Sequence, residues 1–141
     1  MGDVLVQRIV DLTAEAEAVL GIPLVDLFIN DHIDGENTRQ YSDLFLFTEH
    51  HCVQIRNFPN GDTLDIDLIN RSIANVVINK VAFDYVATRP DSRMSVNYST
   101  AAHMGASFSA SRENCMKLME IVRTRIVPNF YGGGNSPEDS S

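Results

Sequence analysis

The sequence predicts an α+β fold in which a helix starts the chain, about six to seven antiparallel strands follow, and a second helix comes after the last strand. Apolar residues recur at helical spacing near both ends of the chain, whereas short segments between them alternate apolar and polar residues and are divided by turn residues. The 141 residues, of which 44% are hydrophobic, suit one globular domain with its own core.

The first helix is expected within residues 1–23, because apolar residues recur there at three- and four-residue steps. These residues are Leu5, Ile9, Leu12, Ala16 and either Val19 or Leu20. Gly21 follows the stripe and Pro23 cannot continue a helix, so the helix should end at the glycine after about five turns. Residues 24–130 then form the predicted sheet and last helix, and residues 131–141, YGGGNSPEDSS, a flexible tail or an arm that grips a neighbouring subunit.

The segment FLFTEHHCVQI, residues 45–55, contains consecutive histidines next to a cysteine and could be a metal or catalytic cluster or the tip of a β-hairpin. Consecutive side chains on an extended backbone face opposite ways, so His50 and His51 are poorly placed to bind one metal ion. We therefore expect a hairpin with its turn at residues 48–51 and with Cys52 starting the next strand. No metal site, catalytic residue or cofactor is predicted here or elsewhere.

The polar loop NDHIDGENTRQ, residues 30–40, invites a comparison with calcium loops because it contains Asp31, Asp34 and Glu36. An EF-hand loop needs a glycine at its sixth position and a glutamate at its twelfth. Counting from Asn30 or Asp31, neither position is filled in that way. Calcium binding is therefore not expected.

Further strands are predicted after the hairpin. In TLDIDLI, residues 63–69, Leu64, Ile66 and Leu68 should face one way and the two aspartates the other. The segment 73–88 allows one long strand bent near Asn79 or two short ones, with Val81, Phe83 and Tyr85 on one face. Residues 93–99 and 103–111 supply two more, with Gly105 as a turn or bulge residue.

The last helix should begin at Ser111 as its N-cap and end before Pro128. Its predicted apolar stripe consists of Cys115, Leu118, Met119, Val122 and Ile126. Cys52 and Cys115 are expected to be reduced thiols packed as small hydrophobic residues.

The formal net charge of -8 disfavours nucleic acid and anionic membrane surfaces as partners. No stretch approaches the roughly 18 apolar residues of a membrane-spanning helix, and the N-terminus lacks the pattern of a secretory signal. These features predict a cytoplasmic protein without integral membrane association.

Three segments in this order resemble the pleckstrin-homology-like (PH-like) fold. LFLFTEHHCVQI matches two strands joined by a polar turn, IDLINRSIANVVI matches a third strand and its connection, and FSASRENCMKLMEIVRTRI matches the last strand and a capping helix. The stretch from Ser42 to Val127, about 60% of the chain, carries the resemblance. It implies a strongly bent antiparallel sheet or partly open barrel, capped by the C-terminal helix, that acts as a binding module for lipid headgroups or peptides.

Phosphoinositide-binding members of that family carry clustered basic residues on the first hairpin. This sequence has Glu49, His50 and His51 there and only Arg56 nearby, so phosphoinositide binding is not expected. Other candidate ligand-binding residues lie further along. Arg89 and Arg93 lie in one loop and could hold a carboxylate or phosphate, but pairing with the many surface acids is the favoured interpretation because exposed ion pairs are common. The full set of candidate ligand-binding residues is Arg56, Phe83, Arg89, Arg93, Asn97 and Arg112, of which Phe83, Asn97 and Arg112 are compatible with a small pocket.

The leading functional hypothesis is a non-enzymatic binding or oligomerisation module that recognises a protein or peptide partner, or a second copy, through an open strand edge. One alternative is a protein with a pocket for a nucleotide-like small ligand, either sequestering or hydrolytic. Another is a small acidic adaptor similar to secretion chaperones, which likewise begin with a helix, an LGIPL-like segment and strands. That class needs a central helix where this chain has NRSIANVV, whose β-branched residues favour a strand.

Overall fold

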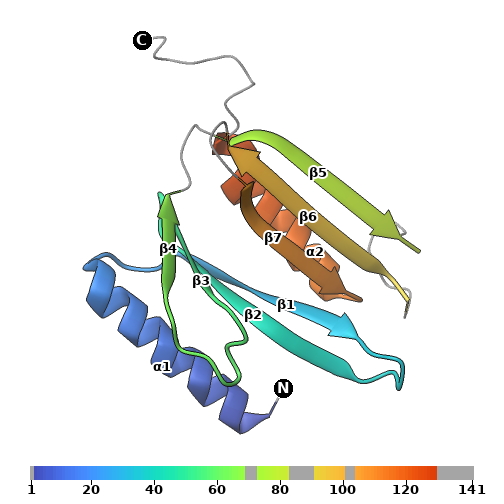
Figure 1. Cartoon of the computed structure of the whole chain (residues 1–141), viewed down its shortest axis with the longest axis horizontal. Coiled ribbons are helices and arrows are strands. Elements are labelled where there is room, and N and C mark those ends of the chain that lie inside the picture. The colour runs from blue at the N-terminus through green and yellow to red at the C-terminus, as the bar shows by residue number, and fades with distance from the viewer. Residues whose placement is uncertain (1, 69–72, 83–90, 101–103, 130–141) are drawn as a thin grey trace. The chain divides into compact units, whose positions relative to one another are not determined.

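The computed structural model describes residues 2–68, 73–82, 91–100 and 104–129 of the chain (Figure 1). The chain divides into two compact units, Met1–Leu68 and Ile69–Ser141. The predicted α+β composition with a helix near each end is confirmed. The single bent sheet or partly open barrel is wrong, because the described strands form one sheet of four strands and a separate sheet of three. The physical reason is that β4 pairs with β3 and β5 pairs with β6, so the described strands are not joined into one ladder.

The first unit is a helix followed by an antiparallel meander of strands in the order β1-β2-β3-β4. Its elements are α1 (Asp3–Leu20), β1 (Asp26–Ile33), β2 (Arg39–Phe47), β3 (His51–Ile55) and β4 (Asp65–Leu68). Gly21 ends α1 as predicted, with a left-handed φ of 69° and its N–H donated to the Glu17 carbonyl at 2.8 Å.

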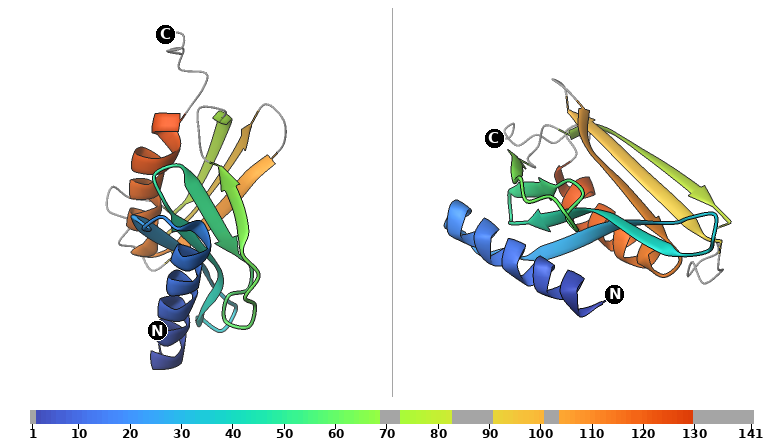
Figure 2. Two further views of the ribbon diagram at one scale, coloured as in Figure 1. Left: turned by 90° about the vertical axis from the view of Figure 1, so that its left-hand side faces the viewer. Right: turned by 60° about the horizontal axis from the view of Figure 1, so that its bottom comes forward.

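Helix α1 covers one face of this sheet with the apolar stripe that the sequence predicts (Figure 2). Leu12 and Ala16 are buried, and Leu5, Ile9 and Leu20 pack around them. The sheet and its loops contribute Leu44, Leu46, Val53, Ile55 and Phe58 to the same cluster. Each fully buried large side chain of this kind contributes about 1.5–3 kcal/mol, so the stripe holds the helix on the sheet.

Arg8 fastens the loop between β3 and β4 to α1. Its Nε donates to the carbonyl oxygen of Phe58 at 2.7 Å, and its terminal nitrogen donates to that of Gly61 at 2.6 Å. A side chain at Gly61 would meet the Arg56 carbonyl oxygen at 2.6 Å, so this tight loop requires glycine. Phe58 anchors the apolar side of the loop and Arg8 satisfies its carbonyls.

The second unit consists of three antiparallel strands in the order β5-β6-β7 and a C-terminal helix. Its elements are β5 (Ile73–Val81), β6 (Arg93–Thr100), β7 (Met104–Ser111) and α2 (Asn114–Ile121), with a π-helical turn at Val122–Ile126 and a 3-10 turn at Val127–Asn129. Helix α2 packs against β7 and β6. The segment 73–81 is one strand, whereas Phe83, Tyr85 and the predicted tail lie outside the described residues.

Ser111 is not the N-cap that the sequence predicts. It is the last residue of β7, and Glu113 precedes the helix. Between them Arg112 adopts a left-handed φ of 55° and donates its N–H to the Ser92 carbonyl at 2.8 Å, which holds the chain to β6 before the helix begins. The buried stripe is Cys115, Leu118, Ile121, Val122 and Ile126. Met119, predicted in the stripe, is only half-buried.

Gly105 lies where β6 and β7 pair irregularly, as the prediction of a bulge residue requires. The Tyr98 ring packs directly over this glycine, so that a Cβ at position 105 would overlap three of its ring carbons. Tyr98 also stacks on Phe108 with the ring centroids 6.3 Å apart. The Tyr98 ring therefore occupies the space that a side chain at position 105 would need, so the aromatic pair requires glycine there.

We expect Gly105→Ala to lower the free energy of unfolding by about 1–3 kcal/mol, because Tyr98 must move from its packed position. Urea denaturation followed by circular dichroism measures the change. Gly35→Ala is the matched control, since a Cβ there meets no atom within 4 Å. Equal stability of the two variants would show that the space over Gly105 is unimportant.

We expect Arg8→Met to lower the free energy of unfolding by about 1–3 kcal/mol, since the change keeps an aliphatic side chain but removes two hydrogen bonds from a charged donor. Gln7→Met on the exposed side of the same helix is the control and should change stability by less than about 0.5 kcal/mol. Chemical denaturation of both variants provides the comparison. An unchanged Arg8→Met protein would mean that the β3–β4 loop is held by Phe58 alone.

Candidate functional site

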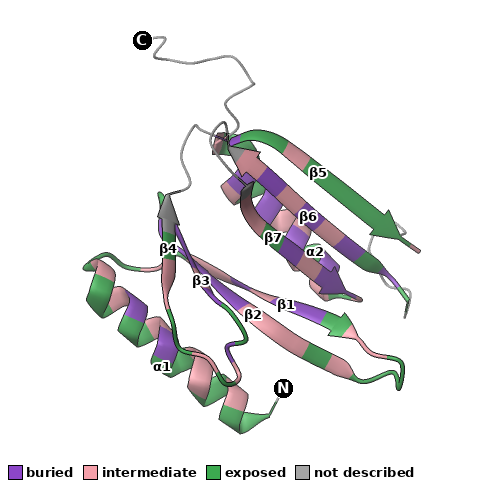
Figure 3. Ribbon diagram, viewed as in Figure 1, coloured by how far each residue is buried: buried purple, intermediate pink, exposed green. Residues whose placement is uncertain are grey.

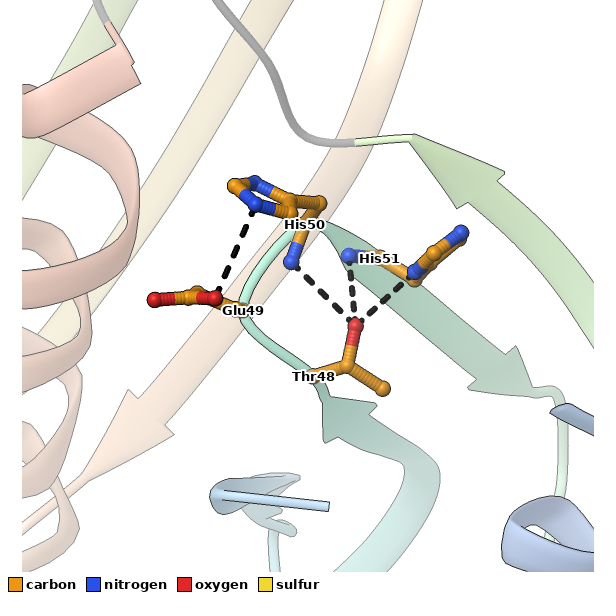
Figure 4. A network of polar contacts seen from close by, with 4 residues as sticks. All are labelled: Thr48, Glu49, His50 and His51. Carbon is orange, nitrogen blue, oxygen red and sulfur yellow. Dashed lines mark hydrogen bonds and ion pairs between the residues drawn. The ribbon is translucent and has the colours of Figure 1, made fainter. Parts of the chain in front are cut away.

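The turn between β2 and β3 resolves the question raised by the two histidines (Figure 4). The buried Thr48 organises it: its Oγ1 accepts the N–H of His50 at 3.2 Å and that of His51 at 2.9 Å, and lies 2.9 Å from His51 Nδ1. The His50 ring points away from His51 and lies 3.7 Å from a Glu49 carboxylate oxygen. The predicted hairpin tip is confirmed, and the two imidazoles do not converge on one point.

Cys52 and Cys115 are both buried, as predicted, and no disulfide joins them. The Sγ of Cys115 donates to the Ala110 carbonyl oxygen at 3.6 Å. Within the residues that the structure describes, no three histidine, cysteine or acidic side chains are grouped to hold a metal ion.

Asp34 and Asp31 in the 30–40 segment form hydrogen bonds or an ion pair with other residues of the chain. Asp34 Oδ1 accepts the N–H groups of Glu36 at 2.9 Å and Thr38 at 3.0 Å, and its Oδ2 accepts Gln40 Nε2 at 3.0 Å. The backbone hydrogen bond from Thr38, followed by that from Glu36, lowers the pKa of Asp34 from its ordinary value. Asp31 lies 3.1 Å from Arg39 Nε with its own side chain fully buried.

The predicted ligand-binding residues are divided between the two units. Arg56 belongs to the first unit, is exposed, and lies 3.4 Å from Asp65 Oδ2. Arg93 and Asn97 are on one face of β6, and Arg112 follows β7 at the end of the sheet where Arg93 pairs with Ser111. Phe83 and Arg89 lie outside the described residues. A ligand-binding role for these six residues stays a prediction.

One face of the three-stranded sheet is lined by hydroxyl and amide side chains. The cross-strand register places Asn79, Ser95 and Ser109 in one row and Val77, Asn97 and Ser107 in the next. Ser107 Oγ donates a hydrogen bond to Asn97 Oδ1. The alternate serines of residues 107–111 are the sequence signal of this face, and they carry no charge.

Strand β5 forms one edge of this sheet and exposes apolar side chains. It pairs with β6 on one side, and no other described strand pairs with it. Three of its large apolar side chains are exposed: Val77 by 46%, Ile78 by 41% and Val81 by 47%. Figure 3 shows the strand exposed along most of its length. We call the outward side of residues 75–81 the β5 edge.

The sheet register explains the exposure of one of these apolar residues, Ile78. Val76 lies opposite Tyr98 and Ile78 opposite Val96, so both belong to the face on which the buried residues of β6 lie. Helix α2 packs against β7 and β6. The apolar face of the sheet thus extends beyond the strands that α2 contacts and leaves Ile78 partly in solvent.

The sheet edges of the first unit carry features that discourage strand addition, whereas the β5 edge has few of them. Strand β4 has only four residues, and β1 contains a register shift between Ile29 and Asp31 together with the buried Asp31 carboxylate. Short strands, bulges and inward-facing charges protect edges. On β5 the irregularity lies before Asn75, and Lys80 is the single charged residue of the strand.

Compared with models of protein families, with curated proteins and with solved structures, the chain matches none. Among residues 2–68, 73–82, 91–100 and 104–129, no helix is long and apolar enough to cross a membrane. Function is therefore inferred from the chemistry of the described surfaces.

We expect the Asp34 carboxyl to titrate below its ordinary pKa of 3.8 in the folded protein, since the carboxylate form accepts the turn's hydrogen bonds. The sign follows from linkage: the charged form stabilises the fold above the unfolded pKa, and this contribution is lost as pH falls through the lower folded pKa. Carboxyl NMR during an acid titration measures it, with Asp34→Asn identifying the signal. A pKa at or above the ordinary value would contradict the turn geometry.

Proposed function

We propose that the chain is a non-enzymatic protein-interaction module that binds an extended polypeptide segment along the β5 edge. The observation that carries the proposal is the nine-residue edge strand with Val77, Ile78 and Val81 exposed. An edge strand presents backbone N–H and C=O groups that a further strand can pair with, while pockets between alternate side chains select the sequence of the added strand.

The energetics favour a weak, reversible complex. Each backbone hydrogen bond gained would contribute about 0.5–1.5 kcal/mol, and each favourable cross-strand side-chain pair about 0.2–1 kcal/mol. Ordering a flexible segment and losing its freedom of movement offset much of this gain. Affinities on the order of micromolar are therefore expected for a single added strand.

The distribution of charge supports the same surface. The chain has 19 acidic residues, yet β5, β6 and β7 contain none of them, and their charged residues are Lys80 and Arg93. A segment rich in β-branched residues, neutral or slightly acidic, would meet no like charge on these strands.

The other hypotheses have less support from the described residues. A small-ligand pocket depends on Phe83 or Tyr85, which lie outside them. For the secretion-adaptor class, residues 73–77 of the segment that would form a central helix belong to β5. The PH-like resemblance remains a proposal and adds no ligand of its own.

A library of extended peptides selected against the immobilised protein at low surface density tests the proposal. We expect it to enrich peptides that alternate β-branched residues, and their binding to shift the backbone amide NMR signals of residues 75–81. Ile78→Lys should weaken the selected peptides about tenfold, because a charge replaces an apolar cross-strand contact.

Ile66→Lys is the matched control. Ile66 is 39% exposed on the edge strand β4, close to the 41% of Ile78 on β5. Peptide binding should be unchanged in this variant. Enrichment of no extended peptides, or binding that Ile66→Lys weakens and Ile78→Lys does not, would overturn the assignment to β5.

A further inference from the structure

The amino-acid order of β5 indicates which polypeptide fits its own edge. The strand reads Ile-Ala-Asn-Val-Val-Ile-Asn-Lys-Val from Ile73 to Val81, and side-chain types repeat in reverse order about Val77. When two such strands run antiparallel about that residue, like types meet over Asn75 to Asn79, which belong to the part of β5 that pairs regularly with β6. The resulting pairs are Val77 with Val77, Val76 with Ile78 and Asn75 with Asn79.

Resting on the proposed function of the β5 edge, we propose that its occupant is β5 of a second copy of the chain, paired antiparallel about a twofold axis at Val77. Two identical strands joined by a twofold axis form an isologous contact, which closes on itself as a dimer. The two three-stranded sheets would become one sheet of six strands, because each has the order β5-β6-β7 with β5 at its edge.

The backbone permits this register. In an antiparallel ladder, residues opposite each other either both direct their N–H and C=O groups at the partner or both direct them away. Within the regular part of β5, Asn75 to Val81, pairs centred on one residue join positions separated by an even number, so the two members have the same direction. A register centred between two residues would join unlike directions and opposite faces.

Other centres of symmetry match the side chains poorly. Centring on Val76 places Asn75 against Val77, and centring on Ile78 places Asn79 against Val77 and Lys80 against Val76. The Val77 centre instead pairs Asn75 with Asn79, which are both exposed amides, and the exposed Val77 with its own copy. The Lys80 side chains of the two copies lie near opposite ends of the contact, so no like charges face each other.

The contact would cover the apolar surface that the sheet leaves open. Val76 and Ile78 lie opposite Tyr98 and Val96, on the face with the buried residues of β6. In the proposed dimer, Val76 and Ile78 of both copies form a cluster of four β-branched side chains that continues this face across the axis. A contact limited to one strand pair is smaller than most stable interfaces, which fits a dimer that forms at micromolar concentrations.

Sedimentation equilibrium of the full chain across the micromolar range tests the inference. We expect a monomer–dimer equilibrium whose dissociation constant rises about tenfold in Val77→Glu and in Val77→Lys, since each variant places two like charges directly opposite. An equimolar mixture of the two variants should restore dimerisation, because Glu then faces Lys. This rescue also shows that both variants are folded.

Val6→Glu is the matched control, as Val6 on α1 is 48% exposed and Val77 is 46% exposed. Its dissociation constant should equal that of the unmodified chain. A monomer throughout the concentration range, a dimer unaffected by Val77→Glu, or a mixture that shows no rescue would each overturn the inference. The peptide experiment is independent of this result: peptides that bind β5 of a monomeric chain would sustain the proposed function while this inference fails.

Discussion

The row of backbone N–H and C=O groups on the outer side of β5 is the constraint that links this fold to a function. In a three-stranded sheet the central strand pairs on both sides, but each outer strand pairs on one, so half of its backbone groups need water or another chain. The strand has nine residues, and contact of its exposed valine and isoleucine side chains with water is unfavourable. The same row therefore limits the stability of the isolated sheet and provides the route for recognition.

Each helix covers an apolar face of a sheet, but the two helices differ in how much of that face they cover. Helix α1 is 18 residues long and extends its stripe from Leu5 to Leu20 over the first sheet. The α-helical part of α2 has only eight residues, and it packs against β7 and β6. Ile78 of β5, on the same face of the sheet, is left 41% exposed.

Local features of the fold could be predicted from the sequence because they depend on neighbouring residues. The α1 stripe, its end at Gly21 and the turn at Thr48 all follow from spacing within a few positions. The choice of strand partners could not be predicted in this way. Alternation in residues 64–68 and the β-branched residues of 73–81 both indicate strands, but neither pattern contains information on whether the strands pair with each other. Ser111 illustrates the same limit: it has the chemistry of an N-cap, yet the bond from Arg112 to Ser92 keeps it in β7.

The candidate site was missed for a related physical reason. Arginine in a sequence indicates a specific chemistry, pairing with carboxylate or phosphate, but Arg56 lies beside Asp65 in an ion pair. The segment IANVVINKV, in contrast, has the composition of any buried strand. Only its edge position makes that composition informative. The charge distribution is consistent with this edge as a binding surface. Acidic residues lie throughout the first unit but in none of the strands β5, β6 and β7. Like charges that repel most approaches, together with strands that carry no acidic residue, favour association at this sheet over unspecific contact.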